Sequence, residues 1–452
     1  MVDLTRRHFF GGLAGATAIA GAAAAKAPIA GKRRAGSMFA YAAPRLDTLR
    51  CGVIGLGERG TPMLKILLAI DGVRVNALCD IDETVLDLGM KAVAERQGGP
   101  PARITGSTTA FTRLCERDDI DVVFVFTPWE WHAPMALAAM KSDKHAFVEV
   151  PMATSAEDMW KLVETSEATQ RHCMMMENCC YGRDELMVLN MVRQGVFGEL
   201  LHGQGAYIHD LRHQLGKPER GEGLWRPAWH TRRHGNLYPT HGLGPIAQYM
   251  DINRGDRFDY VVAMDSPALG MAKYAREKLP ADSPRRKWRF IAGDVSSSLI
   301  KTVKGRTIFV QHDTSTPRPY DRLNYIQGTN GAFGGYPNRI ALEEGGLSGD
   351  HEQWDTDMAK YYAKYDHPLW TKLAGLAAVN GGHGGMDFVM MWRIIACLRN
   401  GLPVDQPVYD GAAWSVLFDL TDKSARTRST PQTIPDFTRG AWERAASFQI
   451  AV

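Results

Sequence analysis

The sequence predicts an α/β protein whose N-terminal half is built around a parallel β-sheet covered by helices. Strand-like segments that are apolar almost throughout alternate there with segments of helical spacing, as in a sheet buried on both faces. A glycine-rich stretch, "GLGERG", separates the first such strand from the first helix. Beyond an N-terminal leader, roughly 400 residues remain, which is enough for two domains and a large core.

The first 44 residues predict an export signal followed by a linker. Arg6 and Arg7 precede a weakly apolar run from Phe9 to Ala25 that is rich in Gly and Ala, the pattern of a signal peptide. The paired arginines favour the twin-arginine route, which carries folded proteins. A membrane span needs about 20 strongly apolar residues, which this run lacks. We therefore expect the twin-arginine export machinery as a partner and a periplasmic or secreted location.

Charge and cysteine content indicate an ordinary soluble enzyme. The formal net charge is +3 and 23% of residues are charged. Basic residues cluster only mildly, so nucleic acid is not an expected partner. The seven cysteines include the adjacent pair Cys179 and Cys180. This odd number does not suggest a disulfide framework, and most of these thiols are expected in the core.

The strand-like segments then follow in order. "LRCGVIGLG" is the first, and "GTPMLKILLAI" after it has helical spacing. Four more segments continue the alternation: "VRVNALCD", "DVVFVFTP", "HAFVEVP" and "HCMMMEN". Because dinucleotides bind at the carboxyl ends of such parallel strands, the residues that end each strand are the first candidates for a cofactor site.

The glycines of the first loop fit a Rossmann dinucleotide-binding motif. Gly55, Gly57 and Gly60 lie between a strand and a helix, and Asp80 ends the next strand, which is the context that the motif requires. The helix N-terminus favours a pyrophosphate. Asp80 would accept hydrogen bonds from the adenosine ribose and repel a 2′-phosphate, by about 4 kcal/mol at ~4 Å and an effective dielectric near 20. The motif therefore predicts NAD rather than NADP.

The segment "FVFTPWEWHAPMALAAMKSDKHAFVEVP" resembles the glucose-fructose oxidoreductase and inositol dehydrogenase superfamily. This resemblance implies a Rossmann domain, here residues 45–178, and a second α/β domain with an open, mostly antiparallel sheet, here residues 179–452. The superfamily's usual strand ending is Glu-Lys-Pro, whose Lys assists hydride transfer. Val150 replaces that Lys, which weakens the interpretation as a plain dehydrogenase.

Strings in the second half resemble a narrower family, the NAD-dependent α-N-acetylgalactosaminidases of glycoside hydrolase family 109. They are "NCCYGRDELMVLNMVRQGVFGEL", "YIHDLR", "LYPTHGLGPIAQYMDINRGDRFDYVVAM", "NGGHGGMDFVMMWR" and "PVYDGAAWSVLFDLT". The similarity runs from about Leu49 to Arg439, and the family is described with twin-arginine signals. It implies a glycan with terminal N-acetylgalactosamine as substrate.

The chemistry that this resemblance implies is hydrolysis without net redox change. Hydride leaves sugar carbon 3 for NAD, and the resulting ketone acidifies the proton on carbon 2. Loss of that proton expels the group on carbon 1, water adds, and the hydride returns to carbon 3. Such enzymes are exceptions to the two-carboxylate mechanism of most glycosidases. A cofactor restored in each turnover can be exported and never exchanged.

The resemblance also implies roles for individual residues. Contacts to NAD fall on the loop glycines and on residues at strand ends or just beyond: Gly55, Gly57, Glu58, Arg59, Gly60, Asp80, Trp129, Glu130, Trp131, His132, Glu149, Val150 and Asn178. Substrate contacts fall on Tyr207, Arg226, Tyr238, Pro239, Thr240, His241 and Tyr320. Tyr and His suit proton transfer. We favour Tyr238 and His241 near carbon 3 and Tyr207 or Tyr320 at carbon 2; which group removes which proton stays open.

Simpler interpretations compete with some of these roles. Without the resemblance, Tyr238 would be a core residue, and His241 would cap or pack a helix. His132 could pack beside its two Trp neighbours. "GGHGG" at Gly381–Gly385 offers one His without acidic or Cys partners, so we predict a tight loop there and no metal site.

Two other functions stay open. An exported oxidoreductase that retains NAD(P) would oxidise one sugar and reduce another, which Val150 disfavours. A noncatalytic sugar-binding protein is disfavoured by the intact glycine loop and Asp80. The anomeric preference and a homo-oligomeric state also stay open.

Overall fold

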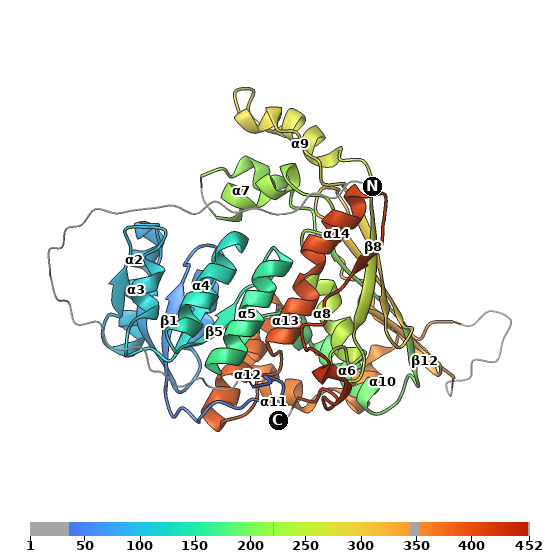
Figure 1. The fold of residues 1–452 in the computed structure, drawn as a ribbon, viewed down its shortest axis with the longest axis horizontal. Helices are drawn as coiled ribbons and strands as arrows, with labels where there is room; N and C mark the ends of the chain where they lie inside the picture. The colour runs from blue at the N-terminus through green and yellow to red at the C-terminus, as the bar shows by residue number, and fades with distance from the viewer. Residues whose placement is uncertain (1–35, 220, 344–352, 451–452) are drawn as a thin grey trace, which may run out of the picture. The chain divides into compact units, whose positions relative to one another are not determined.

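The computed structural model describes residues 36–219, 221–343 and 353–450 (Figure 1). The predicted export signal and linker cover residues 1–44, and all of them except residues 36–44 lie outside the described residues. Within the described ranges, no helix is both long and apolar enough to cross a membrane.

The N-terminal half forms the predicted parallel sheet. Its strands are β1 (Leu49–Ile54), β2 (Val73–Cys79), β3 (Ala102–Ile104), β4 (Val122–Val125), β5 (His145–Val148) and β6 (Cys173–Met175). They are parallel throughout, in the order β3-β2-β1-β4-β5-β6. All residues of β4, β5 and β6 are buried, and all of their side chains except that of His145 are apolar. The order reverses between β1 and β4, where the carboxyl ends open a crevice for a ligand.

Five helices connect these strands: α1 (Gly60–Leu68), α2 (Glu83–Gln97), α3 (Phe111–Cys115), α4 (Trp129–Lys141) and α5 (Ala156–Thr169). α1 packs beside α2, while α4 packs beside α3 and α5. α2 begins at Asp82, whose carboxylate accepts hydrogen bonds from the backbone N–H groups of Thr84 and Val85, and it ends at Gly98 with φ +74°. Both ends therefore follow ordinary capping chemistry.

The second half is built on an open, mostly antiparallel sheet, as expected. Its strands are β7 (Leu200–Ile208), β8 (Phe258–Asp265), β9 (Ser296–Thr302), β10 (Thr307–Asp313), β11 (Tyr325–Gly328), β12 (Gly331–Gly334), β13 (Arg339–Leu342) and β14 (Gln432–Thr433). The order is β13-β12-β11-β7-β10-β9-β8-β14. β7 and β10 pair in parallel, and the other neighbours are antiparallel.

The helices of this half are α6 (Arg183–Arg193), α7 (Glu222–Trp225), α8 (Thr240–Tyr249), α9 (Gly270–Lys278), α10 (Met358–Tyr365), α11 (Pro368–Asn380), α12 (Met386–Asn400), α13 (Val408–Ser415) and α14 (Leu417–Arg426). α8 packs on β7, and α14 packs on β8. Short 3-10 turns include η1 (Asn178–Tyr181) and η3 (Arg226–Thr231).

Two C-terminal helices return to the parallel sheet. α12 packs against α1, β1 and η1, and α13 packs against α5 and β6; Figure 1 shows α13 beside α5 although about 240 residues separate them. The largest hydrophobic cluster is accordingly continuous from Leu49 to Trp414 and beyond. The division at residue 178 stays a prediction, and the packing shows that later residues complete the N-terminal layer.

Candidate active site

A cavity of about 630 Å³ opens at the carboxyl ends of β1, β2, β4 and β5 and extends to β7 and the start of α8. Most of the predicted site residues line it: Gly55, Gly57, Glu58, Arg59, Asp80, Trp129, Trp131, His132, Glu149, Val150, Asn178, Tyr207, Arg226, Tyr238 and His241. The cofactor candidates and the substrate candidates therefore share one cavity.

Five predicted residues do not line this cavity. Gly60 opens α1, Pro239 and Thr240 are buried at the start of α8, and Glu130 is exposed on α4. Tyr320 is 41% exposed; its ring centroid lies 6.4 Å from that of Tyr207. The structure thus places Tyr320 near Tyr207 and leaves Glu130 without a place in the cavity.

The glycine loop has the tight turn that a dinucleotide requires. Gly55 has φ +89°, and a side chain on Gly60 would overlap the Gly55 carbonyl oxygen. The backbone N–H of Leu56 donates to Asp80 Oδ2 at 2.6 Å, which fixes the Asp80 carboxylate beside the loop. The loop and the acidic residue therefore have the arrangement that suits NAD.

Arg59 joins the glycine loop to two carboxylates. Its Nε lies 2.6 Å from Glu149 Oε1 and its Nη1 lies 2.8 Å from Asp387 Oδ2. Asp387 Oδ1 also accepts from the Asn178 amide at 2.7 Å, and Asp387 Oδ2 lies 2.7 Å from His383 Nδ1. Burial by itself would raise the pKa of Asp387, but the His383 hydrogen bond and the Arg59 charge hold it well below its usual value.

Aromatic rings enclose Arg226 at the other end of the cavity. The guanidinium carbon lies 4.7 Å from the ring centroid of Tyr238, 5.3 Å from Trp129 and 5.6 Å from Tyr207. Glu222 Oε2 pairs with Arg226 Nη1 at 2.6 Å. The charge of the buried guanidinium is balanced by the Glu222 carboxylate. Its remaining N–H donors and the tyrosine hydroxyls form a polar wall suited to sugar hydroxyls.

The two tyrosines of this wall are neutral phenols. Burial raises the pKa of Tyr238 well above its usual value, and burial also raises that of Tyr207, in both cases against the opposing charge of Arg226. The Tyr207 hydroxyl lies 3.0 Å from His209 Nδ1. Both tyrosines can therefore donate or accept a hydrogen bond, and neither is a phenolate base near neutral pH.

The His241 ring packs against both of these tyrosines. Its ring centroid is 4.8 Å from that of Tyr238 and 5.4 Å from that of Tyr207. Its position depends on a close contact between α8 and β7, because a side chain on Gly242 would overlap the backbone nitrogen of Ala206. The absence of a Cβ at Gly242 thus brings the start of α8 onto the sheet.

His132 has a structural role in addition to lining the cavity. Its Nδ1 lies 2.7 Å from the Pro151 carbonyl oxygen and its Nε2 lies 2.7 Å from the Thr127 carbonyl oxygen. The ring therefore ties together the chain segments that follow β4 and β5.

Sequence reasoning missed two buried acids, Glu177 and Asp387. Glu177 Oε1 lies 2.7 Å from His241 Nδ1, and Asp387 holds Arg59 as described. Each acid borders an apolar run, "CMMMEN" and "MDFVMMW". An acidic residue beside such a run is the signal that could have marked them, since a buried carboxylate needs partners.

Family comparisons cover nearly the whole described chain. The family described as "Oxidoreductase family, NAD-binding Rossmann fold" matches residues 49–177, and "Glycosyl hydrolase 109, C-terminal domain" matches residues 181–444. With the geometry of the glycine loop and Asp80, the first match shows that the N-terminal part binds NAD.

Curated relatives match along their full lengths. A "Glycosyl hydrolase family 109 protein 1" of Shewanella sp. (strain ANA-3) is 55% identical over 100% of this chain and 99% of its own. A "Glycosyl hydrolase family 109 protein" of Shewanella baltica (strain OS185) is 56% identical over 98% of both.

Solved structures share the fold at low sequence identity. Levoglucosan dehydrogenase in complex with NADH matches with a TM-score of 0.65 and 18% identity, over 86% of this chain and 100% of its own. The apo scyllo-inositol dehydrogenase of Lactobacillus casei matches with a TM-score of 0.60 and 14% identity, over 86% and 99%. These likenesses confirm the two-part α/β architecture.

Proposed function

The chain belongs to glycoside hydrolase family 109, and on that premise we propose that it removes terminal N-acetylgalactosamine by NAD-dependent oxidation, elimination, addition and reduction. The observation that carries this proposal is that a single cavity contains both the dinucleotide loop with Asp80 and the cluster of Tyr207, Tyr238 and His241. A sugar bound at the cluster would lie next to the cofactor.

The pairing of two carboxylates that line the cavity, Glu149 and Glu222, also favours the proposal. Glu149 is paired with Arg59, and Glu222 with Arg226. Burial by itself would raise the pKa of Glu222, but Arg226 holds it below its usual value. A conventional glycosidase needs a carboxylic acid that is protonated near neutral pH. Glu149 and Glu222 are instead occupied in holding arginines.

The proposed roles follow from the neighbours of each side chain. Bound NAD supplies the hydride acceptor. We assign His241 to the proton of the carbon 3 hydroxyl and Tyr238 to a hydrogen bond that orients this hydroxyl. Tyr207 is assigned to the proton of carbon 2: its hydroxyl lies 3.0 Å from His209 Nδ1 and can pass its own proton there as it accepts the proton of carbon 2. Tyr320, whose ring lies near that of Tyr207, is assigned to the same carbon. Arg226 and the aromatic rings hold the sugar and exclude water.

Hydrolysis in deuterated water tests this sequence of steps. The proton on carbon 2 is removed and replaced, so the released N-acetylgalactosamine should carry deuterium at carbon 2, as measured by NMR or mass spectrometry. Free N-acetylgalactosamine incubated with the enzyme under the same conditions is the control for later exchange. Product without deuterium at carbon 2 excludes the elimination mechanism. Net accumulation of oxidised sugar without cleavage would instead identify a sugar oxidoreductase.

We also propose that the twin-arginine pattern directs export of the folded, NAD-loaded protein. Arg6 and Arg7 and the weakly apolar run after them support this proposal. In a host with this pathway, cell fractionation should find the parent chain outside the cytoplasm and the Arg6→Lys, Arg7→Lys double variant inside it. If the parent and the double variant are distributed equally between the cytoplasm and the exported fraction, the proposal is contradicted.

A further inference from the structure

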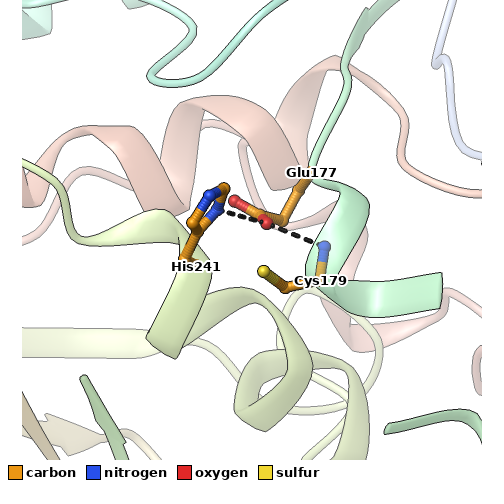
Figure 2. A group of neighbouring side chains, drawn as sticks. All are labelled: Glu177, Cys179 and His241. Atoms are coloured by element: carbon orange, nitrogen blue, oxygen red, sulfur yellow. Dashed lines mark hydrogen bonds and ion pairs between the residues drawn. The ribbon is translucent and has the colours of Figure 1, made fainter. Parts of the chain in front are cut away.

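The strongest unexplained feature near the site is a buried glutamate against His241. Figure 2 shows Glu177, two residues after β6 and directly before η1, turned toward the His241 ring on α8. Glu177 Oε1 lies 2.7 Å from His241 Nδ1 and accepts from the backbone N–H of Cys179 at 3.1 Å. The Glu177 side chain is 0% exposed, and that of His241 is 13% exposed.

The two elements that carry this pair are packed closely. A side chain on Gly244 would come 3.0 Å from Glu177 Cγ, so α8 lies directly over the glutamate. Gln406 Nε2 donates to the Glu177 carbonyl oxygen at 3.2 Å, which holds the backbone. The separation of carboxylate and imidazole is therefore fixed by the fold from both sides.

We propose that Glu177 is a positioning residue for His241, which holds the Nδ1–H of the imidazole and leaves Nε2 as the proton acceptor toward the cavity. An ionised carboxylate only accepts hydrogen bonds, so Nδ1 must carry a hydrogen. In the neutral ring, Nε2 is then unprotonated. His241 lines the cavity, so this nitrogen is the one available to a bound sugar.

The charge of Glu177 also stabilises the protonated ring. When Nε2 takes a proton from the carbon 3 hydroxyl, the imidazole becomes a cation, and the carboxylate 2.7 Å away favours this cation. Burial by itself would raise the pKa of Glu177, but the charge and hydrogen bond of His241 hold it below its usual value. The role in the reaction rests on the proposed function, whereas the tautomer does not.

Other titratable groups face the pair without replacing Glu177. They are Cys179 on η1, Tyr207 on β7 and Tyr238 before α8; Arg226 on η3 lies over the Tyr238 ring. Burial raises the pKa of Cys179 well above its usual value, so it is a neutral thiol. Arg226 is paired with Glu222. Capping of η1 alone does not explain Glu177, because a shorter Asp or Asn caps equally well.

A metal ion is the competing explanation for this arrangement. Glu177, Cys179 and His241 offer ligand atoms that all lie within 4.8 Å of one another. A metal held by Nδ1 would displace the proton that the inference requires. Elemental analysis of the purified NAD-containing enzyme distinguishes the two: an equimolar transition metal that is lost on His241→Asn substitution overturns the inference, and a metal-free active enzyme supports it.

The pH dependence of Glu177→Gln provides the main test. Loss of the carboxylate charge removes the stabilisation of the imidazole cation, so the acid limb of the kcat/KM profile should move about 1 to 3 units to lower pH. We expect kcat at the optimum to fall about 10²-fold, with retained NAD and little change in KM. If kcat of Glu177→Gln falls while the acid limb stays in place, Glu177 contributes only to packing, and the inference is overturned.

Asp410→Asn is the matched control. Asp410 is another buried carboxylate, 2.7 Å from Arg254 Nη2, and neither residue lines the cavity. This variant should lower the melting temperature and leave the acid limb where it is. A shift as large as that of Glu177→Gln would show that the effect is not specific to the pair and would overturn the inference.

A measurement on the parent enzyme covers the case in which Glu177→Gln does not fold. With [¹⁵N]histidine labelling and His241→Asn for assignment, NMR should show His241 protonated at Nδ1 and unprotonated at Nε2 in its neutral form. The opposite tautomer overturns the inference. This result is independent of catalysis, so an enzyme inactive on every sugar would contradict the proposed function and leave the Glu177 test intact.

Discussion

Tyr238 and His241 differ in what they can contribute to proton transfer. The phenol of Tyr238 is neutral because burial raises its pKa, so its contribution is a hydrogen bond. His241 has a buried carboxylate behind it and a nitrogen left for the cavity. The two residues should therefore fail in different ways when they are substituted.

We expect His241→Ala to lose about 10² to 10⁴ in turnover, the usual contribution of a general base, or roughly 3 to 5 kcal/mol of barrier. Tyr238→Phe removes one hydroxyl and keeps the ring, so packing against Trp129 should survive. Both variants should keep bound NAD. Steady-state kinetics, NAD content and melting temperature check this. A Tyr238→Phe enzyme within a factor of two of the parent in kcat removes Tyr238 from the mechanism.

Asp387 should matter for the cofactor end of the cavity. Asp387→Asn leaves Arg59 with Glu149 alone and removes one partner of a buried ion pair, which costs about 3 kcal/mol of unfolding free energy. Because its pKa is lower in the folded chain, this stabilisation is present above about pH 4 and is lost as the pH falls further. Urea unfolding should show a larger difference between parent and variant at pH 7 than at pH 3, where part of the stabilisation remains.

The same variant should release NAD more readily, since Arg59 is part of the glycine loop. Ultrafiltration and absorbance of the filtrate measure this. If Asp387→Asn retains all its NAD but has a lower free energy of unfolding, Asp387 contributes to folding and not to cofactor retention.

Glu177 and Asp387 also show why part of the site was out of reach of the sequence. Glu177 is 64 residues from His241, and Asp387 is 328 residues from Arg59. The residues next to either acid in the sequence do not indicate which distant residue it will contact. The strand ends, in contrast, could be located by pattern, because a parallel sheet places them together regardless of the connections.

The contact between β7 and α8 makes a separate prediction. Gly242→Ala adds a methyl group where the Ala206 backbone leaves no room, so α8 must move and take His241 with it. We expect a lower melting temperature and a loss of kcat that exceeds the loss of folded protein.

Gly375→Ala is the control for this substitution. Gly375 lies in α11, and a Cβ there meets no atom within 4 Å, so the variant should be as stable as the parent or more stable by about 0.5 to 1 kcal/mol. Unchanged activity in both variants would show that the β7–α8 contact tolerates expansion and does not position His241.

The pattern of strands and helices predicted the parallel sheet well. The segments containing β1, β2, β4, β5 and β6 all form strands, because long apolar runs have few other ways to be buried. β3 was not predicted, since "ARI" is three residues long and carries an arginine. The return of α12 and α13 was likewise not predicted, because it depends on packing between distant segments.

Retention of NAD is the clearest prediction for the complete protein. A cofactor restored in each turnover need not dissociate, and an affinity near 1 nM corresponds to about −12 kcal/mol. Dialysed protein should release roughly one NAD per chain on denaturation, measured by an enzymatic assay of the supernatant. Protein that is empty after dialysis and works only with added NADP would contradict both retention and the role of Asp80.

The return of the C-terminal helices has a consequence for synthesis of the protein. A nascent chain that has emerged only to residue 385 contains every strand of the parallel sheet and the glycine loop, but it lacks α12, which packs on β1 and α1 and carries Asp387. Until α12 has emerged, Arg59 of the glycine loop lacks its Asp387 partner, and β1 and α1 lack the helix that packs on them. We therefore expect stable retention of NAD only in chains that have been translated beyond α12.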